Sequence, residues 1–98
     1  MNNSLTLIVR IKARKERAEE VKQSLLDILE PTRAEAGCES YKLYIDDKEP
    51  SVFIFVETWT TRAHWEAHNQ TPHLATFLSL AETAVENVDI TEVTEHDA

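Results

Sequence analysis

The side chains best suited to acid–base chemistry gather between residues 57 and 77. This segment holds three of the four histidines and both tryptophans of the chain. His68 and His73 lie at the predicted end of one helix and the predicted start of the next. Because a helix N-terminus disfavours an imidazolium, we expect a neutral His73 that can accept a proton from a substrate hydroxyl. Alternatively, both histidines only fix the helix–helix corner through hydrogen bonds to the backbone.

A row of aromatic side chains ends in a carboxylate at the start of this segment. Every second residue of a predicted strand contributes to it: Phe53, Phe55, Glu57 and Trp59. Alternate residues of a strand share one face, so the row is typical of the edge of a ligand pocket. The alternative is that Trp59 fills a core or a dimer interface while Glu57 pairs with a basic residue of the first strand, Arg10 or Lys12.

Metal binding is a weaker hypothesis for the same segment. His64 and His68 are four residues apart, which lets two imidazoles on a helix share an ion. Glu66 is one position later than in the zincin motif, and the sequence offers no obvious third ligand. Cys38 is the only cysteine, which excludes an internal disulfide and a thiolate cluster. We therefore expect no metal, and a surface position for His64.

The first half of the chain reads as a strand followed by a helix. Residues 5–13 alternate in the manner of a strand, and apolar residues recur at helical spacing from Lys15 to Ala36. Pro31 lies inside that helical pattern, so we expect a kink or break within residues 27–31. Gly37 is a suitable helix stop.

The second half supplies three more strands and a second, divided helix. The ranges 39–46 and 51–59 are predicted strands, with Tyr41 and Tyr44 on opposite faces of the first. A short helix from Thr60 or Thr61 to Asn69 precedes one that starts at Thr71 and Pro72. Its expected buried face consists of Leu74, Phe77, Leu78, Ala81 and Ala84 or Val85. Residues 88–95 form the last predicted strand.

The order of these elements is β-α-β-β-α-β, which is typical of an α+β, ferredoxin-like domain with an antiparallel sheet. A chain of 98 residues is the length of a single domain, residues 1–98. Its helices can cover only one face of the sheet. Residues 51–59 are apolar on both faces, so we expect a second copy of the chain to cover the other face, giving a homodimer through the sheets.

Composition excludes some partners. The formal net charge is −8, which disfavours nucleic acid and anionic membrane surfaces. No apolar run approaches the ~20 residues that span a bilayer, and the N-terminus does not have the pattern of a signal peptide. We expect a soluble, cytoplasmic protein.

Several of these residues together resemble the antibiotic biosynthesis monooxygenase family, in particular its quinol monooxygenase branch. The pattern consists of Gly37-Cys38-x-x-Tyr41, Glu57-x-Trp59, Ala63-His64-x-Glu66-Ala67-His68-x-Gln70-Thr71-Pro72-His73 and Phe77. The resemblance covers nearly the whole chain. It implies a dimeric α+β barrel with a pocket between sheet and helices, and oxygenation by O₂ without flavin, haem or metal.

The resemblance also implies roles for matching positions. A deprotonated quinol or polyphenol can itself reduce oxygen, so the protein need only bind the ring, take a proton, stabilise the anion and exclude water. His68 or His73 would be the base, and Glu57 would orient a histidine. The ring of a small aromatic substrate would pack on aromatic side chains, namely Trp59, Tyr41, Trp65 and Phe77.

Two other functions are compatible with the sequence. One is an isomerase of the type that processes phosphorylated autoinducer-2, because basic residues could supply a phosphate pocket: Arg10, Lys12, Arg33 and Lys42. The other is a non-catalytic dimeric domain that binds a small molecule. An aromatic ring between Trp59 and the histidines would favour the monooxygenase, and a phosphate near arginine or lysine would favour the isomerase.

Overall fold

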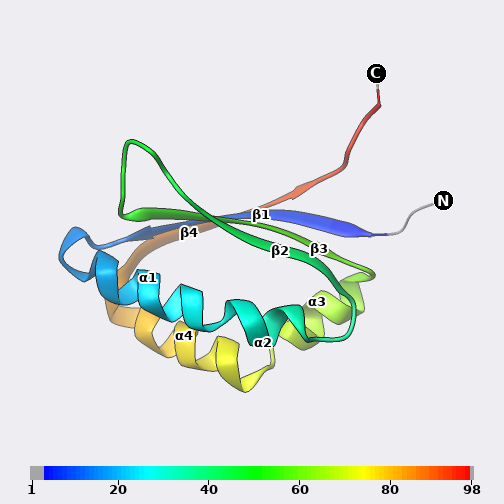
Figure 1. Cartoon of the computed structure of the whole chain (residues 1–98), viewed down its shortest axis with the longest axis horizontal. Helices are drawn as coiled ribbons and strands as arrows, with labels where there is room; N and C mark the ends of the chain where they lie inside the picture. Colours follow the sequence, from blue (N-terminus) through cyan, green and yellow to red (C-terminus); the bar gives the residue numbers. More distant parts are fainter. Residues whose placement is uncertain (1–3, 98) are drawn as a thin grey trace.

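Strands and helices follow one another in the order that the sequence predicts. In the computed structural model, which describes residues 4–97, all helices lie on one side of a four-stranded sheet (Figure 1). The elements are β1 (Leu5–Ala13), the 3₁₀ turn η1 (Lys15–Arg17), α1 (Ala18–Asp27), α2 (Leu29–Arg33), β2 (Cys38–Ile45), β3 (Val52–Trp59), α3 (Arg62–His68), α4 (Pro72–Ala84) and β4 (Val85–Val93). No helix among these residues is long and apolar enough to cross a membrane.

The sheet has the strand order β2-β3-β1-β4, and each neighbouring pair is antiparallel. The two consecutive strands β2 and β3 form a hairpin, whereas helices connect the other strands. In register, Glu57 of the central strand β3 lies between Leu7 of β1 and Tyr41 of β2. The predicted α+β, ferredoxin-like fold with an antiparallel sheet is therefore confirmed.

The expected break in the first helical segment occurs at Ile28, between α1 and α2. Pro31 has no N–H, so the carbonyl of Asp27, four residues earlier, cannot receive the regular helix hydrogen bond. The helix stop is Gly37, whose φ of +82° is the left-handed conformation that glycine adopts most readily. A Cβ atom at this position would lie 2.2 Å from Cγ of His64. The α2–β2 connection thus packs directly on α3.

Two threonine caps define the corner between α3 and α4. The hydroxyl of Thr61 accepts the N–H of His64, and that of Thr71 accepts the N–H of Leu74. Pro72 occupies the first position of α4. These starts, both predicted, place His68 at the last residue of α3 and His73 at the second residue of α4.

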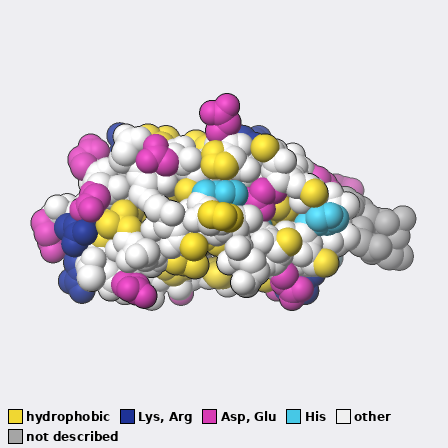
Figure 2. Space-filling model, turned by 90° about the horizontal axis from the view of Figure 1, so that it is seen from below, with side chains coloured by type: hydrophobic (Ala, Val, Ile, Leu, Met, Phe, Trp, Pro, Cys, Tyr) yellow, Lys and Arg dark blue, Asp and Glu magenta, His cyan; other side chains and the backbone are white. Residues whose placement is uncertain are grey.

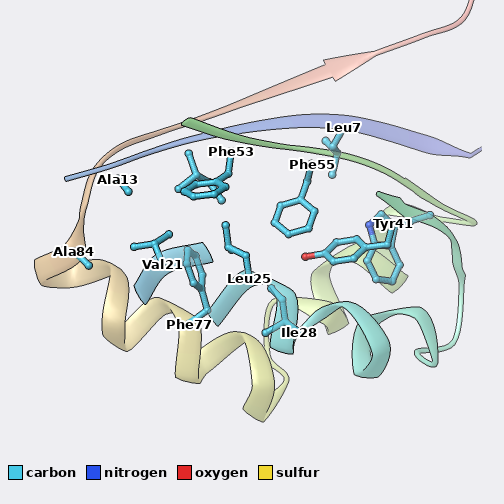
Figure 3. Close-up of a cluster of buried hydrophobic side chains, with 12 residues drawn as sticks. Leu7, Ala13, Val21, Leu25, Ile28, Tyr41, Phe53, Phe55, Phe77 and Ala84 are labelled. Carbon is cyan, nitrogen blue, oxygen red and sulfur yellow. The ribbon is translucent and has the colours of Figure 1, made fainter. Parts of the chain in front are cut away.

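The core lies between the helices and one face of the sheet (Figure 3). Its largest members include Leu7, Leu25, Phe53, Phe55 and Phe77. Two expectations for the C-terminal part were wrong. Leu78, assigned to the buried face of α4, is 50% exposed. The last strand begins at residue 85 rather than 88, because α4 passes into β4 without a loop.

Within residues 4–97, the opposite face of the sheet has no helix above it (Figure 1). Phe53, Phe55, Glu57 and Trp59 all point to the helices, which settles which face of β3 carries the predicted aromatic row. Ile54 and Val56 point the other way and are half-buried, and Tyr44 is exposed beside Ile54. Tyr41 and Tyr44 therefore lie on opposite faces, as predicted.

Candidate active site

A cavity of about 130 Å³ lies between the sheet and the helices. Its walls come from β1, β2, β3, β4, α1, α3 and α4, and they are mainly aliphatic and aromatic. The polar side chains among them are few: Tyr41, Glu57, His68, Asn69 and the indole of Trp65. Seen from the helix side, Figure 2 shows histidine and acidic surface next to hydrophobic patches near the middle of this face. An apolar cavity with a few converging polar groups is the usual form of a small-molecule site.

Glu57 is a carboxylic acid held in apolar surroundings. It is 4% exposed, and its Oε1 accepts the Nε1–H of Trp59 at 2.9 Å. Burial raises the pKa of Glu57 to about 7, with the Trp59 hydrogen bond opposing the shift and the nearby Glu35 charge adding to it. Near neutral pH the side chain can therefore either give or take a proton at the cavity wall.

A second carboxylate, Glu35, joins the two histidines. Its Oε2 lies 2.8 Å from Nδ1 of His68 and 2.7 Å from Nε2 of His73. A carboxylate only accepts hydrogen bonds, so each imidazole donates an N–H to the same oxygen. The neutral His68 tautomer that does so carries its lone pair on Nε2. Since His68 lines the cavity, Nε2 is the nitrogen available to a ligand there.

Aromatic rings fix the orientation of His68 on its other sides. Its ring centroid lies 4.8 Å from that of Trp59 and 5.7 Å from that of Tyr41, which in turn stacks on Phe55 at 4.6 Å. His68 is only 3% exposed, so its ring has little freedom to turn. The side chain is thus held in one orientation at the cavity wall.

Tyr41 contributes a phenol that stays protonated. Burial raises its pKa far above the usual range, and the neighbouring charge of Glu57 raises it further. Figure 3 shows its hydroxyl directed toward Leu25 and Ile28, two residues that line the cavity. In this state Tyr41 can donate a hydrogen bond to an oxygen atom of a bound ring.

The structure brings most of the predicted site residues to the cavity, but not all. Tyr41, Glu57, Trp65, His68 and Phe77 line it. The other two predicted members, Trp59 and His73, are not among the lining residues. Trp59 is fully buried behind Glu57 and His68 and supports both. His73 shares Glu35 with His68, and the two ring centroids lie 6.2 Å apart. Of the two candidate bases, His68 is therefore the one in position to meet a ligand.

Glu35 is the member of this cluster that the sequence did not reveal. Glu57 was expected to orient a histidine, but its hydrogen bond goes to Trp59, and Glu35 has the orienting position. Glu35 follows α2 and is separated from His68 by 33 residues and from His73 by 38. No motif connects positions so far apart, and only the packing of the α2–β2 connection on α3 brings them together.

The cluster of Glu35, His68 and His73 is also the set of side chains best able to hold a metal ion. Their ligand atoms lie within 4.8 Å of one another. Two imidazoles and one carboxylate suit a divalent transition metal. An ion with bonds of about 2.0–2.2 Å would have to draw these atoms together and replace the two hydrogen bonds to Glu35. His64, the other candidate ligand, instead pairs with the hydroxyl of Thr61.

The basic residues proposed for a phosphate pocket lie elsewhere. Arg10, Lys12 and Lys42 are on the open face of the sheet, as their pairing with β3 shows. Arg33 donates from Nε to the backbone oxygen of Tyr41 at 2.9 Å. No arginine or lysine of residues 4–97 lines the cavity. A phosphate group bound in this cavity would therefore have no arginine or lysine side chain of residues 4–97 to pair with.

Comparison with known proteins gives one consistent result. The sequence model of the antibiotic biosynthesis monooxygenase family matches residues 4–80. The crystal structure of PA3566 from Pseudomonas aeruginosa is 34% identical and superposes with a TM-score of 0.93, covering 99% of this chain and 98% of that one.

Two curated relatives are similar to this chain in sequence. The Escherichia coli K12 protein named "Probable quinol monooxygenase YgiN" is 31% identical over 85 residues, covering 74% of this chain and 80% of its own length. The uncharacterized Synechocystis protein sll1783 is 38% identical over 68 residues. That match covers 69% of this chain and 46% of the relative, so the chain spans less than half of its length. With the family match and the fold in agreement, this chain belongs to the antibiotic biosynthesis monooxygenase family.

Proposed function

We propose that this protein is a cofactor-independent monooxygenase that oxidises a quinol or another hydroxylated aromatic molecule with O₂. One observation carries the proposal: His68 stands at the wall of an apolar cavity with Glu35 hydrogen-bonded to its outer nitrogen, 2.8 Å away. Membership of the family and the name of the Escherichia coli relative support a monooxygenase activity. The absence of arginine and lysine from the cavity wall, within residues 4–97, disfavours the phosphate-binding isomerase.

The first step of the proposed reaction is removal of a hydroxyl proton. His68 takes the proton at Nε2, and Glu35 stabilises the resulting imidazolium through Nδ1–H. A carboxylate that orients a histidine and stabilises its charged form is a recurring arrangement in enzymes. Tyr41 holds an oxygen of the ring, and the apolar wall, including Trp65 and Phe77, excludes water from the anion.

The electron-rich ring anion then reduces oxygen directly. For a hydroquinone, one oxygen atom is inserted into a ring C–H bond and the other leaves as water. The organic product is the hydroxyquinone, and the ring supplies all four electrons that O₂ needs. Glu57, with a pKa of about 7, can deliver or take up a proton during these steps. No external reductant enters this balance.

We also infer a homodimer formed through the open face of the sheet. Ile54 and Val56 are half-buried there without a helix above them, and Ile8 and Tyr44 are exposed beside them. A sheet with apolar residues on both faces is stable when both faces are covered. A second copy of the same face is the simplest cover, because a two-fold axis makes such a surface complementary to itself.

Oxygen consumption tests the proposed reaction. Protein freed of metal by a chelator should consume O₂ with at least one member of a panel of hydroquinones and polyphenols, faster than their spontaneous autoxidation. His68→Ala should abolish this activity while keeping the fold by circular dichroism. Each measurement is repeated after addition of Fe²⁺, Mn²⁺ or Zn²⁺. Activity that appears only with an added ion would contradict a cofactor-independent mechanism, and no activity at all would favour a binding domain.

A further inference from the structure

Three large apolar side chains stand exposed beside the cavity. Leu78 of α4 is 50% exposed, and Val88 and Ile90 of β4 are 45% and 54% exposed. All three also belong to the cavity lining. They therefore form a continuous apolar surface from the interior of the cavity to solvent, which we call the mouth.

The sheet register explains why the mouth is apolar. Val88 lies opposite Ile11, and Ile90 lies opposite Val9, so these side chains share the face that the helices cover elsewhere. β4 is an edge strand, and its residues Val88 and Ile90 remain exposed although they lie on the inner face of the sheet. Leu78 of α4 lines the same cavity and is also exposed. Two strand residues and one helix residue thus stand where folding of the chain alone does not bury them.

The volume of the cavity limits what can enter it. An apolar cavity of about 150 Å³ holds one benzene molecule. At about 130 Å³, this cavity has room for one six-membered ring and little more. A substituent on that ring must leave through the mouth, where its surroundings are Leu78, Val88 and Ile90.

We propose that the mouth binds an apolar chain attached to the aromatic ring, so that the substrate class is hydroquinones or phenols with an alkyl or isoprenoid-like substituent. This inference rests on the proposed function and specifies its substrate. The ring lies beside His68 and Glu57 in the closed part of the cavity. The apolar substituent of the ligand covers the three mouth residues and buries the surface that the folded protein leaves exposed.

Binding of redox-stable 4-alkylphenols tests the proposal without requiring turnover. The dissociation constants of phenol, 4-propylphenol and 4-pentylphenol are measured by calorimetry under argon. Burial of each methylene contributes about 0.8 kcal/mol to the binding free energy, so affinity should rise about fourfold per methylene while the alkyl group remains in contact with the mouth. In the double variant Val88→Thr, Ile90→Thr this dependence of affinity on the length of the alkyl group should weaken. Leu26→Gln is the matched control, because Leu26 is an exposed apolar residue outside the cavity lining.

Three results would overturn the proposal. One is an affinity independent of chain length, and another is the same dependence in the double variant as in Leu26→Gln. The third is a double variant whose mass in light scattering falls below that of the wild type, because a second copy would then be what covers the mouth. Failure of the proposed oxidation can be told apart from failure of this inference. If affinity depends on the length of the alkyl group but no quinol supports oxygen consumption, the inferred ligand class stands and only the proposed reaction is wrong.

Discussion

At the scale of single residues, the site depends on one carboxylate oxygen shared by two imidazoles. Oε2 of Glu35 accepts from His68 and His73, and this fixes which nitrogen of His68 faces the cavity. In Glu35→Gln the side-chain amide is neutral and can present an NH₂ group to His68 instead of an acceptor. The wrong tautomer of His68 would then be stabilised, with the N–H directed at the substrate.

We therefore predict that Glu35→Gln lowers kcat by about 10–100-fold, in the range found for residues that orient a functional imidazole. KM should change little, because Glu35 is not among the residues that line the cavity. Steady-state kinetics with a quinol identified in the panel provide the measurement, with Glu66→Gln, an exposed acid on α3, as the control. A rise in KM at constant kcat would show that Glu35 serves ligand binding rather than His68.

Glu57 should make stability depend on pH. Its pKa is raised from 4.5 to about 7 in the folded protein. Between these values the folded state binds more protons than the unfolded state, so the free energy of unfolding falls as pH rises from 4.5 to 7 and then levels off. The loss is on the order of 3 kcal/mol, at 1.36 kcal/mol per pKa unit.

Glu57→Gln keeps an oxygen for the N–H of Trp59 and removes the titration. Urea unfolding of both proteins across this pH range isolates the contribution of Glu57 as the difference between the two curves. We expect the free energy of unfolding of the wild type, relative to that of the variant, to fall as pH rises from 4.5 to 7, by the loss given above for the titration of Glu57. A constant difference would mean that the carboxyl group does not titrate in this range.

At the scale of elements, the α2–β2 connection places Glu35 against α3. Gly37 permits this approach, since it has a φ of +82° and a Cβ there would lie 2.2 Å from Cγ of His64. We predict that Gly37→Ala lowers the free energy of unfolding by at least about 1–3 kcal/mol, the cost of a strained backbone conformation, with the steric contact added.

A second variant removes the part of this contact that involves the imidazole ring. Gly37→Ala combined with His64→Ala leaves the backbone strain and the close approach to the Cβ atom of position 64, 2.5 Å away, so it should recover only part of the stability when compared with His64→Ala alone. Urea unfolding measures the wild type, both single variants and the double variant. Equal stability of Gly37→Ala and the wild type would contradict the close packing of this connection on α3.

The sequence predicts the elements well because their signals are local. Alternation in the strands, the threonine caps at Thr61 and Thr71 and the break near Pro31 each depend on a few neighbouring residues. The same local signals place His68 and His73 at one corner. They do not reveal Glu35, because its contact with the histidines spans more than 30 residues. Nor do they show that Leu78 stands at an opening, since helical periodicity identifies an apolar face but not what covers it.

At the scale of the whole molecule, the two faces of β3 have different roles. Phe55 lies in the core with the helices, whereas Val56 lies on the open face. We predict that Val56→Asp converts the dimer to folded monomers, because an unpaired charge would enter an apolar interface. Light scattering at micromolar concentration measures the mass, and Leu26→Asp is the control on an exposed helix position. Phe55→Asp should unfold the chain instead. A monomeric wild type would contradict the inferred dimer.

In the proposed mechanism, His68, held by Glu35, allows a bound quinol to react with O₂ without a cofactor. The most direct test is turnover under ¹⁸O₂ with chelator-treated protein, comparing the wild type with His68→Ala. We expect one ¹⁸O atom in the organic product and one in water, at a rate well above the autoxidation blank, and loss of that rate in the variant. Label incorporation equal to the blank, or unchanged in His68→Ala, would contradict it.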